Sequence, residues 1–185
     1  MMTAPGPAVV LGVGNILLRD DGVGIRIVEG LMAASAAEPR TLPTGTHLVD
    51  GGTLGLDLLR TVHGARALLL LDAVDLAQPA GTVSILRGDA LVAAGSRGGS
   101  TKAGAVGELL AVARLMGWLP DPVSLVGVQV GDTSFGVGLT PQVAAAVPGA
   151  VTAACDELRA LDELATAEWP EAPASRRHDE EEAMA

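Results

Sequence analysis

The chain has 185 residues, enough for one domain with a buried core, and 49% of them are apolar. Its formal net charge of −10 argues against binding to a nucleic-acid backbone, because such a protein needs a basic face. It has no run of about 18 apolar residues, no basic leader and only one cysteine, so we expect a cytoplasmic protein that does not enter a membrane.

A strand followed by a polar turn opens the chain. The apolar run Val9–Val13 predicts a central strand covered on both faces, and this run breaks at Gly12 and Gly14. Asp20 and Asp21 follow where a helix should begin, and we expect Asp20 to cap that helix. In α/β proteins such a loop, at the carboxyl edge of the sheet, commonly holds the functional site.

Further strands and helices follow in alternation. Strands are predicted at 47–49, 67–71, 82–86 and 123–130, and helices at 23–32, 54–62, 105–116 and 141–164. Only about seven residues lead into strand 82–86, too few for a parallel crossover, so that strand should be antiparallel. We therefore expect a three-layer α/β fold of the phosphorylase/hydrolase-like type. Its sheet should be mixed, mostly parallel and five-stranded, with helices on both faces.

Residues 1–164 should form this single domain. Residues 165–185 contain two prolines and the acidic run 179–182, which predicts a disordered acidic tail. Inside the domain, Pro148 should kink or divide the last helix. The glycine-containing segments 95–104 and 131–138 predict loops that could close over a substrate.

Acidic residues follow three of the predicted strands. They are Asp20 and Asp21 after the first, Asp50 after the second, and Asp72 and Asp75 after the third. The carboxyl ends of parallel strands share one edge of a sheet, so these carboxylates can converge, and like charges that close together need a cation. The same acids would repel the pyrophosphate of a dinucleotide.

The segment 12–24, GVGNILLRDDGVG, resembles the opening motif of the hydrogenase maturation endopeptidases. The likeness covers roughly residues 8 to 160 in order and spacing. It continues through VDGGTLG at 49–55, LDAV at 71–74, LVGVQ at 125–129 and GLTP at 138–141.

This resemblance implies a cytoplasmic hydrolase. Such enzymes remove a short C-terminal extension from the large subunit of a nickel-iron hydrogenase after the metal has been inserted. The nickel is presented by the precursor, so no permanently bound cofactor is expected. By the resemblance, Asp21 and Asp72 bind that nickel and take part in catalysis. Residues expected to line the substrate groove or to support the ligands are Gly14, Asn15, Asp20, Asp50 and Asp75.

The family's third metal position, a histidine, falls on Lys102, the single lysine among the 12 basic residues. Lys102 could be a solvated loop residue, or its ammonium could lie against Asp21 and Asp72. A lysine with a lowered pKa could also ligate a metal. The substitution could therefore mean an ion-paired site without a permanent metal, two ligands for the precursor's nickel, or a loss of activity.

Two other functions stay open at this point. One is a non-catalytic homologue that binds the precursor, and the other is a small-molecule hydrolase or nucleotide binder that uses the Gly12–Gly14 loop. Structural roles are expected for His47, His63, His178 and the buried thiol of Cys155. The expected partner is the hydrogenase precursor, with neither nucleic acid nor membrane, and we expect a monomer.

Overall fold

The computed structural model describes residues 6–88, 90–91 and 103–167. Its strands are β1 (Ala8–Val13), β2 (Thr46–Gly52), β3 (Ala67–Val74), β4 (Val83–Arg87) and β5 (Val123–Gln129). Its helices are α1 (Val23–Ala37), α2 (Leu59–Val62), α4 (Ala103–Leu115) and α5 (Pro141–Ala167), with short 3-10 helices η1 (Arg19–Gly22) and η2 (Gly55–Leu58). None of the helices in these ranges is long and apolar enough to cross a membrane.

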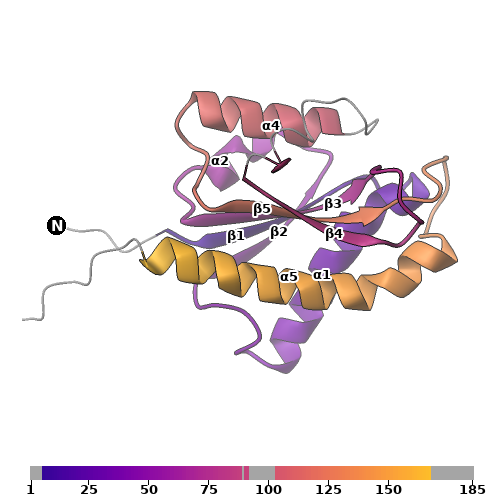
Figure 1. The fold of residues 1–185 in the computed structure, drawn as a ribbon, viewed down its shortest axis with the longest axis horizontal. Coiled ribbons are helices and arrows are strands. Elements are labelled where there is room, and N and C mark those ends of the chain that lie inside the picture. The colour runs from indigo at the N-terminus through magenta and orange to yellow at the C-terminus, as the bar shows by residue number, and fades with distance from the viewer. Residues whose placement is uncertain (1–5, 89, 92–102, 168–185) are drawn as a thin grey trace, which may run out of the picture.

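The five strands form one sheet in the order β2-β1-β3-β5-β4 (Figure 1). The first four strands in this order are parallel to one another, and β4 lies antiparallel along β5. The predicted mixed, mostly parallel sheet is thus confirmed. β4 is antiparallel as predicted, but it pairs with β5 and not with β3, which precedes it in the chain, so it forms the edge of the sheet.

The sheet is the middle of three layers (Figure 1). Helices α1 and α5 cover one face, and α2 and α4 cover the other. Strand β3 shows how both faces are filled, because Leu69 and Leu71 pack with the first helix pair and Leu68 and Leu70 with the second. A strand that is apolar on both faces is typical of a parallel sheet between two helix layers.

Helix α1 approaches the sheet as closely as backbone atoms allow. A Cβ atom at Gly24 would lie 2.3 Å from the carbonyl oxygen of Leu71 and 2.4 Å from that of Val13. At Gly12, a Cβ atom would lie 2.8 Å from the carbonyl oxygen of Gly24. Only glycine permits this contact. The contact brings the start of α1, and the acidic turn before it, against the carboxyl ends of β1 and β3.

Several predicted boundaries were wrong. β2 and β3 run past the predicted turns, so Asp50 pairs with Gly12 of β1 and Asp72 with Gly127 of β5. The neighbouring strands continue at these positions, and the ladder of hydrogen bonds continues with them. Met32 and Leu54, which were expected on packed helix faces, are 42% and 56% exposed.

The last helix is continuous, so a division at Pro148 was wrong, while a kink there stays a prediction. α5 runs through Pro148 as one element, because its apolar face, with Val143 and Ala150 fully buried, packs against the sheet on both sides of the proline. Residues 165–167 belong to α5 and not to a tail. Residues 168–185, where the rest of the acidic tail was predicted, lie outside the described residues.

Candidate functional site

The turn after β1 places Asp21 at the carboxyl edge of the sheet. Gly14 has φ +137°, and a Cβ atom there would lie 1.9 Å from the carbonyl oxygen of Asp21, so the turn passes directly under η1. The backbone N–H of Asn15 donates to Asp21 Oδ2 at 2.8 Å, and Asn15 Oδ1 accepts from the N–H of Leu17 at 3.0 Å. Asp21 is 2% exposed. Its carboxylate is thus held on the inner side of the loop.

Asp72 reaches the same edge from the adjacent strand. β3 lies beside β1, and η1 packs against β3. Asp72 is 7% exposed, and its Oδ1 accepts a hydrogen bond from the N–H of Ala73 at 2.7 Å. Asp21 and Asp72 are therefore two buried carboxylates on contacting elements, at the edge of the sheet where the sequence predicted a site.

Asp20 has a different task from the one predicted. η1 and α1 have no side-chain cap, so the expectation that Asp20 caps the helix was wrong. Its fully buried carboxylate instead accepts hydrogen bonds from the loop 131–140. The donors are the N–H groups of Gly131 and Asp132 at 2.9 Å each, the N–H of Thr140 at 2.6 Å and the Thr140 hydroxyl at 2.9 Å. Asp20 thus fixes this loop beside the turn that carries Asp21.

Further bonds join these two loops. The N–H of Arg19 donates to the carbonyl of Gly136 at 3.0 Å, and the N–H of Gly136 donates to that of Leu17 at 2.9 Å. Arg19, which adopts φ +47°, also forms an ion pair with Asp132 at 3.2 Å. Hydrogen bonds from Ser134 and, to a smaller degree, the charge of Arg19 lower the pKa of Asp132. Figure 1 shows the orange loop 131–140 beside the indigo segment that follows β1, at the right-hand end of the sheet.

Sequence reasoning missed the acid in this second loop. Asp132 follows the fifth strand just as Asp20 and Asp21 follow the first, so the same strand-then-acid pattern could have revealed it. The roles of Arg19 and Thr140 had no comparable signal, because their partners are distant in the sequence.

Asp50 and Asp75 are exposed, and the hydrogen bonds found for them support turns. Asp50 Oδ1 accepts from the N–H of Gly52 at 3.0 Å. Asp75 Oδ1 accepts from the N–H of Ala77 at 3.3 Å and from Gln129 Nε2 at 3.1 Å. A supporting role for either residue at the site stays a prediction.

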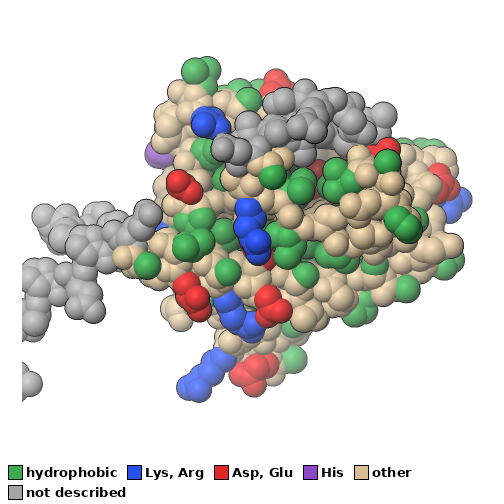
Figure 2. Space-filling model, viewed as in Figure 1, with side chains coloured by type: hydrophobic (Ala, Val, Ile, Leu, Met, Phe, Trp, Pro, Cys, Tyr) green, Lys and Arg blue, Asp and Glu red, His purple; other side chains and the backbone are tan. Residues whose placement is uncertain are grey.

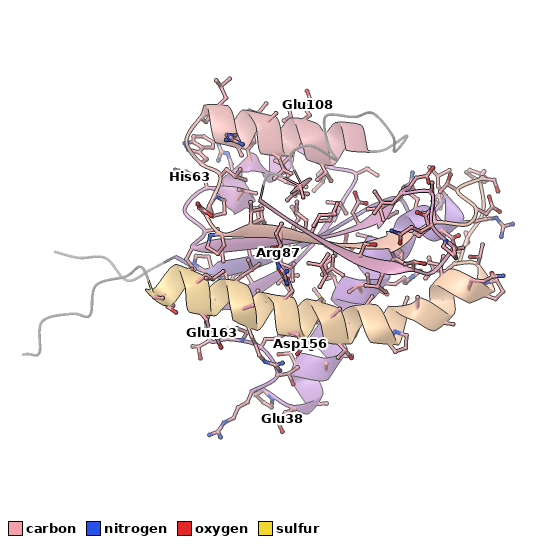
Figure 3. The ribbon with its side chains drawn as sticks, viewed as in Figure 1. Glu38, His63, Arg87, Glu108, Asp156 and Glu163 are labelled. Atoms are coloured by element: carbon pink, nitrogen blue, oxygen red, sulfur yellow. The ribbon has the colours of Figure 1, made fainter. Side chains whose placement is uncertain are left out.

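The other candidates lie elsewhere. Lys102 and His178 are outside the described residues, as are residues 95–102 of the predicted loop 95–104, whose last two residues belong to α4. His47 pairs with Val9 at the amino end of the sheet, as predicted. His63 packs against Trp118 with the ring planes tilted by 44° and the centroids 4.5 Å apart, at the end of the molecule away from the site loops (Figure 3). Cys155 is buried in the core, where burial raises the pKa of its thiol.

The described residues can supply part of a coordination shell. Asp21 and Asp72 offer carboxylate oxygens, which bind divalent ions. Among residues 6–88, 90–91 and 103–167, no three His, Cys, Asp or Glu side chains are grouped so that they could hold a metal ion. Two carboxylates leave most positions of a metal to other ligands.

Comparison with known proteins gives a consistent result. A family model described as hydrogenase maturation protease matches residues 25–157. The hydrogenase expression/formation protein HupD of Rhodobacter capsulatus is 39% identical over 158 residues, which cover 84% of this chain and 73% of that protein. The hydrogenase 2 maturation protease of Escherichia coli is 35% identical over 151 residues, 81% of this chain and 89% of that protein.

The fold agrees with these sequence matches. The solved structure of the hydrogenase maturating endopeptidase HybD from Escherichia coli superposes with a TM-score of 0.73 at 35% identity. The superposition covers 83% of this chain and 93% of that one. The predicted family and the predicted architecture therefore agree with the comparisons.

Proposed function

This chain belongs to the hydrogenase maturation protease family, and we propose that it removes the C-terminal extension of a nickel-iron hydrogenase large-subunit precursor after nickel insertion. The reaction is hydrolysis of one peptide bond. Water supplies a hydroxyl to the new carboxyl end and a proton to the released amine. The nickel belongs to the substrate.

The placement of two buried carboxylates, Asp21 and Asp72, on contacting elements at one edge of the sheet is the observation that carries the proposal. Both carboxylates are almost fully buried, and each is oriented by a backbone N–H group, from Asn15 and Ala73 respectively. They approach from neighbouring elements at one edge of the sheet. A precursor whose metal still has open positions can bind two such oxygens.

Contact with the nickel would bind the precursor and would also position its peptide bond for cleavage. The cleaved segment is attached to the polypeptide that holds the metal, so anchoring the metal fixes the direction in which the chain leaves it. A metal at this point would also polarise a nearby carbonyl group. Gly14 and Asn15 expose backbone beside Asp21, where a peptide can approach closely.

The direct test compares two forms of one precursor. Purified protein is incubated with nickel-loaded or nickel-free large subunit, and intact mass spectrometry detects the shortened subunit. We expect cleavage of the nickel-loaded form and about 100-fold slower cleavage by Asp21→Asn. Asp156→Asn serves as the control, because this exposed residue on α5 pairs only with Arg159 in the described structure (Figure 3).

Three outcomes would contradict the proposal in different ways. Binding of the nickel-loaded precursor without cleavage would indicate a non-catalytic homologue. Equal cleavage of both precursor forms would show that the protein does not recognise the nickel. Equal rates for Asp21→Asn and Asp156→Asn would show that Asp21 is not at the reacting centre.

A further inference from the structure

Large apolar side chains are exposed around the candidate site. Four of them form what we call the apolar rim: Ile16 at 45% exposed, Leu17 at 49%, Phe135 at 81% and Val137 at 77%. Two come from the loop after β1 and two from the loop after β5. Leu54 and Leu56, after β2, are also exposed at this edge, at 56% and 40%. Large apolar side chains that are exposed together on loops joined by hydrogen bonds, as 17–19 and 136 are here, can mark an interaction site in a soluble protein.

The loops that carry the apolar rim are held firmly in place. Gly136, between Phe135 and Val137, exchanges backbone hydrogen bonds with Leu17 and Arg19. Both ends of the loop 131–140 bind the buried carboxylate of Asp20. A flexible loop could fold its apolar side chains inward, but this loop is anchored at both ends and in the middle. Phe135 and Val137 are therefore exposed on a loop whose backbone is fixed by hydrogen bonds.

The apolar rim adjoins the turn that holds the Asp21 carboxylate. Ile16 follows Asn15, whose N–H donates to the Asp21 carboxylate. The charges beside the rim compensate one another, because Arg19 and Asp132 form an ion pair. This contrasts with the chain's overall charge of −10. The ion pair adds no net charge to the rim, whose exposed side chains are apolar and therefore suit an apolar ligand.

We propose that the apolar rim binds an apolar stretch of the precursor polypeptide next to its cleavage site. This inference rests on the proposed function and adds the chemistry of the segment that is recognised. Side chains of that segment would cover Phe135 and Val137 while the metal end of the substrate reaches Asp21. Figure 2 shows apolar side chains in green at several places on the face viewed, its right-hand end among them. Exposed aromatic anchors commonly contribute much of the affinity in such contacts.

The test is a steady-state comparison of two variants on the nickel-loaded precursor. In Phe135→Ser/Val137→Ser, we expect KM to rise about tenfold or more while kcat stays within about twofold. Leu115→Ser is the matched control, because Leu115 is 86% exposed at the end of α4 nearest the start of β5, away from the site edge. Its KM should equal that of the wild type. Thermal unfolding should be unchanged in both variants, since all three side chains are exposed.

The possible failures can be told apart. An unchanged KM in the Phe135/Val137 variant, with a cleaving wild type, overturns the inference and leaves the proposed function intact. Absence of cleavage and binding by the wild type overturns the proposed function, and the inference falls with it. A concentration-dependent dimer that the double substitution abolishes would show that the rim binds a second copy of this chain, which also overturns the inference.

Discussion

Asp20 and Glu157 are both carboxylates with almost no solvent exposure, at 0% and 3%, but their partners differ. Asp20 accepts neutral donors, three backbone N–H groups and one hydroxyl, all from the loop 131–140. Glu157 on α5 binds the guanidinium of Arg87 from β4, with a distance of 2.7 Å from Arg87 Nε to Glu157 Oε1. Figure 3 shows Arg87 between β4 and α5.

The difference separates a stiff region from an adaptable one. At the site edge, the contacts are made to the main chain: the Asp20 carboxylate binds backbone N–H groups, and Gly24 lies against backbone carbonyl groups. On the α5 side, contacts are made by side chains that can move, and Arg87 is 65% exposed. A substitution of the same kind should therefore cost more at the site edge than on the α5 side.

The largest expected effect comes from substituting one glycine in each region by alanine. Gly24→Ala would place a methyl group 2.3 and 2.4 Å from two backbone oxygens that cannot move aside. We expect it to lower the free energy of unfolding by at least about 3 kcal/mol. Gly149→Ala, in α5, meets nothing within 4 Å and should stabilise by about 0.5–1 kcal/mol. Denaturant unfolding measures both, and equal values would contradict the account.

The next largest effect on stability comes from comparing two carboxylates at the site edge, Asp20 and Asp50. Asp20→Asn replaces an acceptor of four hydrogen bonds with a group that carries its own donors, and should lower the free energy of unfolding by about 2–4 kcal/mol. The amides of Gly131, Asp132 and Thr140 should exchange with deuterium much faster. Asp50→Asn, whose Oδ1 accepts one local bond, should change stability by less than about 0.5 kcal/mol. Unchanged exchange in Asp20→Asn would show that another contact holds the loop.

The smallest effect belongs to the α5 side and depends on pH. Burial alone would raise the pKa of Glu157, but the hydrogen bond and charge of Arg87 hold it below the ordinary value of 4.5. Because this pKa is lower in the folded state than in the unfolded state, the pair stabilises the fold above pH 4.5. That stabilisation is lost as the pH falls through the lowered value.

Glu157→Gln should therefore lower the free energy of unfolding by about 1–2 kcal/mol at neutral pH, and by progressively less below pH 4.5. Asp156→Asn, next to it in the sequence, breaks an exposed pair with Arg159 and should change stability by less than about 0.5 kcal/mol at any pH. If Glu157→Gln lowers the free energy of unfolding as much in acid as at neutral pH, the role of the Arg87 pair is contradicted.

Local signals were sufficient to predict the architecture. The apolar run of β1 and the glycines after it predicted a strand and a turn, and both are present. The short connection before β4 predicted its antiparallel direction, since a chain cannot cross over in so few residues. The inward residues of α4, among them Val106, Leu109 and Ala113, followed from helical spacing and are buried.

The contacts that build the site could not be predicted in this way. The donors to Asp20 lie 111 to 120 residues further along the chain, so no local pattern distinguishes this buried anchor from a helix cap. The positions of Asp50 and Asp72 inside their strands depend on how far the neighbouring strands continue. Pro148 failed to divide α5 because packing against the sheet outweighs one lost backbone bond.

As the proposed ligands of one substrate metal, Asp21 and Asp72 should act together. The most direct measurement is the rate of cleavage of nickel-loaded precursor by Asp21→Asn, by Asp72→Asn and by the double variant. If both carboxylates bind one ion, each single substitution should abolish most of the rate, and the double variant should be hardly slower than the slower single one. A double variant whose loss of rate is the product of the two single losses would contradict this shared role, and so would a single variant that cleaves at the wild-type rate.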